Sequence, residues 1–324
     1  MTRNKTLATS LLGLSAAAMF AFTSAGGAAA TSVSPDAKEV SHTVSATLQT
    51  SGVADYWTPE RMRSAIPGDV LAQKAVARGK STARAAVEQG QSTRISGKAG
   101  KGKPSLHTDE NPVPHIGKVF FTLGGVNYVC SGNSVASTNE STVSTAGHCL
   151  NEGPGAFATN FVFVPAYLNG AAPYGKWTAR ALYTTNQWSS GGDIQYDTGF
   201  AVVSPLNGQT LSDTVGASGV EFNASRGLSY KAFGYPAASP FDGQSLKACT
   251  GTAFDDTINP GGTTQGIPCD MTGGSSGGPW FIGSNSEGYQ NSINSYGYGS
   301  RSTTMYGPYW GSVIQQAYNN ASAN

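Results

Sequence analysis

The sequence predicts an all-β fold built from many short strands. Three observations support this prediction: 42 of the 324 residues are glycine, only 12% are charged, and short apolar segments separated by turn residues fill the C-terminal two thirds of the chain. Glycine reaches the positive φ angles of tight turns, and threonine and tyrosine pack well on pleated surfaces. The 20 basic and 19 acidic residues nearly cancel, so overall charge gives no reason to expect nucleic-acid binding.

The first 30 residues have the pattern of a signal peptide. Arg3 and Lys5 form a basic start, residues 7–22 are largely apolar, and residues 28–30 are alanines suited to cleavage. A membrane anchor is the alternative, but the apolar part is short for a span. We therefore expect secretion, with no membrane attachment after the leader is removed.

Residues 31–110 differ in character from the rest and contain no cysteine. Helices are predicted for residues 58–65, which open with Thr-Pro-Glu, and for residues 70–89. Residues 89–104 are rich in glycine, serine and lysine, which is typical of a linker. We expect a removable pro-segment with its linker, and a solvated basic tail is the alternative.

From residue 116 onward, strand-like segments follow one another. Residues 117–123 and 126–130 flank Gly124-Gly125, which predicts a hairpin with a two-glycine turn. Further strands are predicted at 142–145, 160–165, 177–184, 198–203, 228–235, 244–252, 278–282 and 290–298. This spacing is typical of β-barrels or sandwiches, and residues 205–219 are expected to connect two β units.

The C-terminal segment, residues 309–321, is predicted to be a helix. Its apolar residues recur on one face. These are Trp310, Val313, Ile314, Ala317 and Tyr318.

All four cysteines lie after the predicted pro-segment: Cys130, Cys149, Cys249 and Cys269. An even number of cysteines in an exported chain favours two disulfides. Each neighbouring pair would close a loop of about 20 residues and stabilise the fold by about 3 kcal/mol. A zinc site is the alternative, but neither a Cys-x-x-Cys spacing nor a histidine pair is present. We expect no metal and no cofactor.

Three short segments carry residues suited to nucleophilic catalysis. His148 ends a predicted strand, Ser276 lies in a glycine-rich loop, and Asp197 begins an apolar strand. A serine hydroxyl needs an imidazole to take its proton, and a buried carboxylate holds that imidazole in one tautomer. Asp193 is the competing acid, but its turn is rich in glycine. The N–H groups of Gly274 and Ser276 are candidates for an oxyanion hole, which needs convergent donors.

These motifs, Thr-Ala-Gly-His-Cys at 145–149 and Gly-x-Ser-Gly-Gly-Pro at 274–279, resemble those of the chymotrypsin-like (trypsin-like) serine peptidases. The resemblance is greatest to the secreted bacterial branch that includes glutamyl endopeptidases. It implies two antiparallel six-stranded Greek-key β-barrels with a C-terminal helix, at about residues 111–205 and 215–324. It also implies that His148 is the general base, Asp197 the orienting acid and Ser276 the nucleophile.

The resemblance implies further roles. The Cys130–Cys149 pair resembles the disulfide that fixes the histidine loop in this family. Ser295-Tyr296-Gly297 resembles the strand that lines the specificity pocket and pairs with the substrate backbone. Asp270 falls where trypsin-like members hold the acid of that pocket, which slightly favours cleavage after basic residues. Binding local backbone N–H groups is the alternative role for Asp270.

Two positions depart from related enzymes. Ser275 replaces the aspartate that pairs with the new N-terminus when digestive enzymes are activated, so that ion pair cannot form here. Asn294 stands where glutamate-specific members place a histidine, so glutamate specificity is not supported. The other histidines, His42, His107 and His115, are expected at surface or pro-segment positions.

The sequence thus predicts a secreted, monomeric serine endopeptidase that is made as a zymogen and acts on protein or peptide substrates. Two alternatives remain: an esterase with the same triad, and a catalytically silent binding protein of the same fold. An esterase of the α/β-hydrolase type would need a nucleophile elbow on a parallel sheet, and none is present in the sequence.

Overall fold

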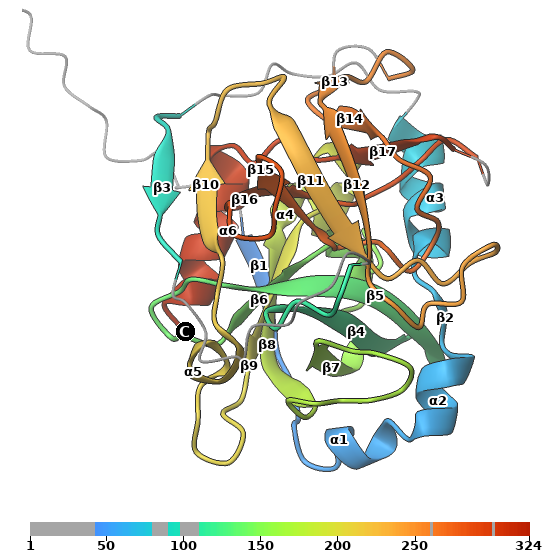
Figure 1. Cartoon of the computed structure of the whole chain (residues 1–324), viewed down its shortest axis with the longest axis vertical. Coiled ribbons are helices and arrows are strands. Elements are labelled where there is room, and N and C mark those ends of the chain that lie inside the picture. Colours follow the sequence, from blue (N-terminus) through green and yellow to red (C-terminus); the bar gives the residue numbers. More distant parts are fainter. Residues whose placement is uncertain (1–42, 80–89, 98–109, 260–261, 300–301) are drawn as a thin grey trace, which may run out of the picture. The chain divides into compact units, whose positions relative to one another are not determined.

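The computed structural model describes residues 43–79, 90–97, 110–259, 262–299 and 302–324 (Figure 1). The described residues all belong to one compact unit, Ser41–Asn324. The predicted signal peptide, the end of the predicted second helix and half of the predicted linker lie outside the described residues. No helix in the described ranges has both the length and the apolar character needed to cross a membrane.

Six antiparallel strands between residues 116 and 203 form a closed barrel. They pair in the order β8-β7-β4-β5-β6-β9, and a further β8–β9 pairing closes the ring. Their bounds are β4 (Ile116–Leu123), β5 (Val126–Val135), β6 (Thr142–Thr145), β7 (Thr159–Pro165), β8 (Trp177–Thr185) and β9 (Gly199–Val203). The predicted hairpin is confirmed, because Gly124 and Gly125 join β4 to β5 with φ angles of 57° and 80°.

The second half contains two sheets around a core that includes Tyr230, Ile267, Trp280 and Met305. One sheet has the order β12-β11-β15-β16-β10-β3, and the other has the order β13-β14-β17. The bounds are β10 (Gly219–Phe222), β11 (Ser229–Gly234), β12 (Lys247–Thr252), β13 (Phe254–Asp255), β14 (Gln265–Pro268), β15 (Pro279–Ile282), β16 (Tyr289–Ile293) and β17 (Thr304–Gly307). The all-β prediction is confirmed. The second barrel is expected to contain only antiparallel pairs, but β10 and β16 pair in parallel.

The predicted C-terminal helix is present as α6 (Ser312–Ser322). Its buried face includes Ile314, Ala317 and Tyr318 and belongs to the largest apolar core, together with Phe200 of β9. Short helices in the connections were not predicted, because each spans only one or two turns. They are α4 (Asn186–Gly191), α5 (Leu211–Val215), and the 3₁₀ turns η1 (Gly147–Cys149) and η2 (Ile194–Tyr196).

The N-terminal part of the described chain adds strands to the edges of both halves. β1 (Thr43–Thr47) pairs antiparallel with β8, and β3 (Thr93–Ile95) pairs antiparallel with β10 (Figure 1). Between them lie α1 (Val53–Tyr56), α2 (Pro59–Ser64), β2 (Ile66–Pro67) and α3 (Asp69–Gly79). The predicted helix start is confirmed, because the Thr58 hydroxyl accepts the Arg61 N–H at the beginning of α2.

His115 is a correction to the sequence prediction. It was expected on the surface or in the pro-segment, but only 9% of it is exposed, and its Nδ1 lies 2.8 Å from Asn133 Oδ1. Burial lowers the pKa of His115, which favours its neutral form. His42 and His107 lie outside the described residues.

Candidate active site

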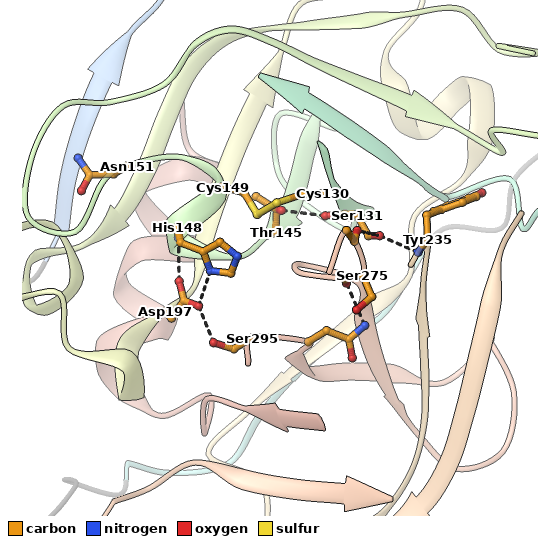
Figure 2. The surroundings of a disulfide bond; sticks show 12 residues. Cys130, Ser131, Thr145, His148, Cys149, Asn151, Asp197, Tyr235, Ser275 and Ser295 are labelled. Atoms are coloured by element: carbon orange, nitrogen blue, oxygen red, sulfur yellow. Dashed lines mark hydrogen bonds and ion pairs between the residues drawn. A yellow bond between two sulfur atoms is a disulfide. The ribbon is translucent and has the colours of Figure 1, made fainter. Parts of the chain in front are cut away.

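His148 lies in η1, directly after β6, and is fully buried. Its Nδ1 lies 2.7 Å from Asp197 Oδ2, and its backbone N–H donates to Asp197 Oδ1 at 2.7 Å (Figure 2). Asp197 therefore contacts both the ring and the main chain of the same residue. This double contact fixes the position and the rotation of the imidazole.

Asp197 is also fully buried and accepts a third hydrogen bond. The Ser295 hydroxyl donates to Oδ2 at 2.5 Å, so both carboxylate oxygens are used (Figure 2). The competing acid, Asp193, is only partly buried and accepts the Gln195 N–H at the start of η2. The geometry thus pairs His148 with Asp197 rather than with Asp193.

Ser276 lies in the glycine-rich loop before β15 and is 4% exposed. Ser131 of β5 holds this loop. Its N–H donates to the Ser276 carbonyl at 2.7 Å, and its hydroxyl donates to the Gly274 carbonyl at 3.0 Å. A Cβ on Gly277 would overlap the Thr145 hydroxyl. The serine loop therefore packs directly on the segment that leads to His148.

Three polar groups at this place have no partner within the described residues. His148 Nε2 is buried and makes no hydrogen bond to any described residue. The hydrogen bond between His148 Nε2 and Ser276 Oγ is therefore not formed. The N–H groups of Gly274 and Ser276 have no acceptor in the same part of the chain. Gly274 has a φ of 95°, a conformation that favours glycine. Unsatisfied groups are rare in buried positions and are therefore candidates for contact with a ligand.

Both disulfides are formed, between Cys130 and Cys149 and between Cys249 and Cys269. The first joins β5 to the residue that follows His148 (Figure 2). Together with His148, these two sulfurs make the one cluster of potential metal ligands found in the described residues. Zinc is bound by free thiolates, and a disulfide offers none.

Comparisons with known proteins place this chain in a family. The protease Anisep from Arthrobacter nicotinovorans is 75% identical, with a TM-score of 0.66, over 67% of this chain and 99% of its own. A thermostable serine protease, AL20, from an extremophilic microorganism is 54% identical, with a TM-score of 0.64, over 65% of this chain and 98% of its own. This chain is a chymotrypsin-like serine protease.

Two further comparisons extend this result. A Glu endopeptidase structure is 20% identical with a TM-score of 0.53, covering 71% of this chain and 98% of its own, which shows a shared fold. An extracellular metalloprotease from Bacillus subtilis (strain 168) is 31% identical over 133 residues, which are 40% of this chain. That match spans only 37% of the Bacillus protein. No family model matches the chain.

Ser275 and Asn294 have structural partners in this chymotrypsin-like protease. The Ser275 hydroxyl donates to the Thr272 carbonyl at 2.8 Å, within its own loop. Asn294 donates to the carbonyls of Ser275 and Phe233 and accepts the Trp280 N–H. All the polar atoms of the Asn294 side chain are thus hydrogen-bonded, and these bonds hold the serine loop in place.

The predicted specificity strand is held firmly in place. Tyr296 is 3% exposed, stacks on Tyr306 with ring centroids 5.2 Å apart, and donates to Asp256 Oδ2 at 2.7 Å. Tyr298 donates to the same oxygen. Asp270, by contrast, is exposed. A solvated carboxylate attracts a cationic side chain only weakly, so the position of Asp270 gives little support to a closed acidic pocket.

Sequence reasoning did not identify Ser131 or the bracing role of Asn294. Both side chains bond to main-chain carbonyls that are distant in sequence, by 143 residues for Ser131 and Gly274 and by 61 for Asn294 and Phe233. No local motif signals such contacts. Ser295 was predicted as a substrate-binding residue, and its bond to Asp197 adds a second contact to that position.

Proposed function

We propose that this chain is the precursor of a secreted serine endopeptidase that hydrolyses peptide bonds through an acyl-enzyme on Ser276. The observation that carries the proposal is the buried contact between His148 and Asp197, with Ser276 in the neighbouring loop of the protease fold. The likeness to the protease Anisep and the serine protease AL20 supports the same chemistry. It also favours protein or peptide substrates.

In the first half of the proposed reaction, Ser276 attacks the carbonyl carbon of the scissile bond. An ionised Asp197 only accepts hydrogen bonds, so His148 donates its Nδ1–H to it and keeps a lone pair on Nε2. Nε2 takes the hydroxyl proton as the bond between Oγ and the carbonyl carbon forms. The same proton then passes to the amine, which leaves as the C–N bond breaks. Asp197 stabilises the imidazolium that exists between these steps.

In the second half, water repeats the attack on the acyl-enzyme. Nε2 takes one proton from the water as its oxygen bonds to the acyl carbon, and then returns that proton to Ser276 Oγ. The ester bond breaks, and the carboxylic acid product leaves. The unpartnered state of Nε2 fits this function, because the atom must be available to two different proton donors in turn.

Charge develops on the carbonyl oxygen during both attacks. We assign the N–H groups of Gly274 and Ser276 as its donors, because neither has an acceptor in the described residues. Ser131 and Asn294 hold the carbonyls of this loop on the opposite side. Donors fixed in advance need little reorganisation when the charge appears, and this is the source of their large effect on rate.

We also propose the division of the precursor. Residues 1–30 are the signal peptide, 31–110 the pro-segment with its linker, and 111–324 the peptidase domain. The last range makes up about two thirds of the chain, which is the share matched by nearly the whole of the Anisep and AL20 structures. A domain of that size folds as a unit, so the N-terminal third is available for removal.

Substrate preference is the least supported part of the proposal. We propose that Ser295, Tyr296 and Gly297 bind the substrate backbone on the acyl side of the scissile bond. A preference for basic residues depends on Asp270, whose exposure limits its electrostatic effect. Cleavage of a peptide library by the wild type and by Asp270→Asn tests this directly, since an unchanged preference removes Asp270 from the pocket.

A fluorophosphonate probe tests the proposed nucleophile. Processed wild-type protein should be labelled on the peptide that contains Ser276, and Ser276→Ala should not be labelled. Ser275→Ala is the matched control, because it changes the adjacent serine and should keep the labelling. Unlabelled processed protein would refute the proposal and favour a silent binding protein. Labelling that persists in Ser276→Ala would refute Ser276 as the nucleophile.

A further inference from the structure

The segment after α2 crosses the catalytic centre. β2 lies parallel to β5, with Ile66 opposite Tyr128 and Pro67 opposite Val129. The Gly68 N–H donates to the Val129 carbonyl at 2.9 Å. A Cβ on Gly68 would lie 2.7 Å from Cys130 Sγ, so only glycine fits against the disulfide that neighbours His148.

Asp69, the next residue, reaches the serine loop. A Cβ on Gly273 would overlap the Asp69 carboxylate, which therefore lies directly against the residue before Gly274. Asp69 therefore lies against the loop that carries Ser276.

Helix α3 then covers the predicted specificity strand. Ala72 and Ala75 are fully buried, and Val76 is 7% exposed, as expected for one face of a helix. These side chains share one apolar cluster with Tyr296, Tyr306, Trp188 and Ile194. Trp188 is also in edge contact with the His148 ring. The helix therefore occupies surface that a substrate would need.

The N-to-C direction of this segment is opposite to that of a substrate bound for cleavage. In the proposed reaction the acyl half of a substrate lies along residues 295–297, so its leaving half extends to the opposite side of Ser276. Figure 2 draws the disulfide and Ser295 on opposite sides of the His148 ring. The pro-segment runs from Val129, past Gly273, to Tyr296. Its peptide bonds thus have the wrong direction for attack by Ser276 with proton delivery to the leaving nitrogen.

Hydrogen bonds made by two side chains, Trp57 and Lys176, hold the segment in place on its N-terminal side. Trp57 is fully buried, and its indole N–H donates to the Asn160 carbonyl at 2.6 Å. Lys176 of the peptidase domain donates to the carbonyls of Ala54 and Trp57, at the end of α1. Anchoring this flank raises the local concentration of the crossing segment at the cleft.

We propose that residues 66–76 form a built-in inhibitor that fills the substrate cleft in the reverse chain direction, so that it blocks the site without being cleaved. The inference rests on the proposed function, because it assigns Ser276 as the group that is shut off. The closed state of the site agrees with it: His148 is fully buried, and Ser276 is nearly so. Activation then requires release of this segment as well as a cut in the chain.

A matched pair of variants in α3 of the full precursor tests the inference. Ala75→Glu places an unpaired charge in the buried contact with Tyr296, whereas Ala77→Glu makes the same change at an exposed position of the same helix. Precursor and processed protein separate on a gel, so the fluorophosphonate labelling of both is measured in one sample. Ala75→Glu should speed labelling of the precursor band by about tenfold or more, because an unpaired buried charge disfavours docking, and Ala77→Glu should not.

The results distinguish failure of the inhibitor proposal from failure of the proposed function. Processed protein of all three chains should label at one rate, which shows that the peptidase domain is intact. A wild-type precursor that labels as fast as the processed protein would overturn the inhibitor but leave the proposed function standing. Labelling of neither form would overturn the proposed function itself. Peptide mapping supplies a second readout, since cleavage between Ile66 and Val76 during autoprocessing would contradict the reverse direction.

Discussion

Ser295 donates a 2.5 Å hydrogen bond to Asp197 Oδ2, the same oxygen that lies 2.7 Å from His148 Nδ1. The predicted specificity strand and the predicted orienting acid are therefore joined by one contact. All three side chains are buried or nearly so, which strengthens hydrogen bonds to a charged group. Movement of this strand is thereby linked to the position of the imidazole.

Ser295→Ala should lower kcat by about tenfold to a hundredfold, the effect of a lost hydrogen bond to a charged group. Steady-state kinetics on processed protein measure it. Ser292→Ala is the control, because Ser292 is also buried but donates to the Pro308 carbonyl instead. Equal effects from the two changes would mean that Ser295 acts through packing alone.

Asp197→Asn should lower kcat on the order of 10⁴-fold with little change in KM, because an amide in this position favours the wrong tautomer of the imidazole in a Ser-His-Asp triad. The matched change is Asp193→Asn, four residues earlier, where an amide oxygen can still accept the Gln195 N–H. That variant should keep its activity. A large loss in Asp193→Asn alone would reassign the orienting acid.

Gly274→Ala should lower kcat by about 100- to 1,000-fold, the effect of losing one oxyanion donor. The φ of Gly274 is 95°, and an added Cβ would lie 2.8 Å from the Ala237 Cβ and 2.9 Å from the Tyr235 carbonyl oxygen. The N–H group must therefore move. Gly283→Ala has the same backbone strain, with a φ of 104°, but nothing lies within 4 Å of its Cβ. Gly283→Ala should lose stability and keep kcat.

Removing either disulfide should lower the free energy of unfolding by about 3 kcal/mol, because their sequence separations of 19 and 20 residues give similar loops. Urea unfolding of paired cysteine-to-alanine variants in the Ser276→Ala background measures this. With Ser276 intact, loss of the Cys130–Cys149 bond should also lower kcat, since it fixes the residue after His148. Equal activity of the two disulfide variants would refute that positional role.

Docking of the pro-segment should weaken as pH rises. Burial raises the pKa of Asp69 above its ordinary value of 3.8, and the charge of His148 opposes this. The docked carboxyl thus binds its proton more tightly than the free one. Docking is strongest below pH 3.8 and weakens as pH rises through the raised pKa.

Probe labelling of the precursor should therefore increase with pH more steeply than that of the processed protein, whose profile corrects for titration of the site itself. In Asp69→Asn, labelling of the precursor should rise with pH no more steeply than labelling of the processed protein. Identical profiles for wild-type precursor and processed protein would show that Asp69 does not control docking.

The sequence predicts the strands, the hairpin and the C-terminal helix well, because alternating apolar residues and positive-φ glycines are local signals. Gly124 and Gly125 are the clearest example. It also identifies His148, Asp197 and Ser276 as candidates, because the chemistry demands those residue types in recognisable surroundings.

Other features depend on contacts that only the fold creates. The parallel pairing of β10 with β16 and the addition of β1 to β8 join segments that carry no shared local pattern. Ser131 looks like any strand serine, although it holds the Gly274 carbonyl. Likewise, α3 was predicted as a helix, but nothing in its sequence indicated that Ala72 and Ala75 would pack against Tyr296.

The most direct test of the central claim is to trap the acyl-enzyme. Processed protein is mixed with a slowly hydrolysed peptide ester, quenched in acid and digested, and the peptides are weighed by mass spectrometry. We predict that the acyl group is found on the peptide containing Ser276 and that no adduct forms with Ser276→Ala. Hydrolysis of peptide substrates by Ser276→Ala at the wild-type rate, or an adduct on another residue, would contradict the account.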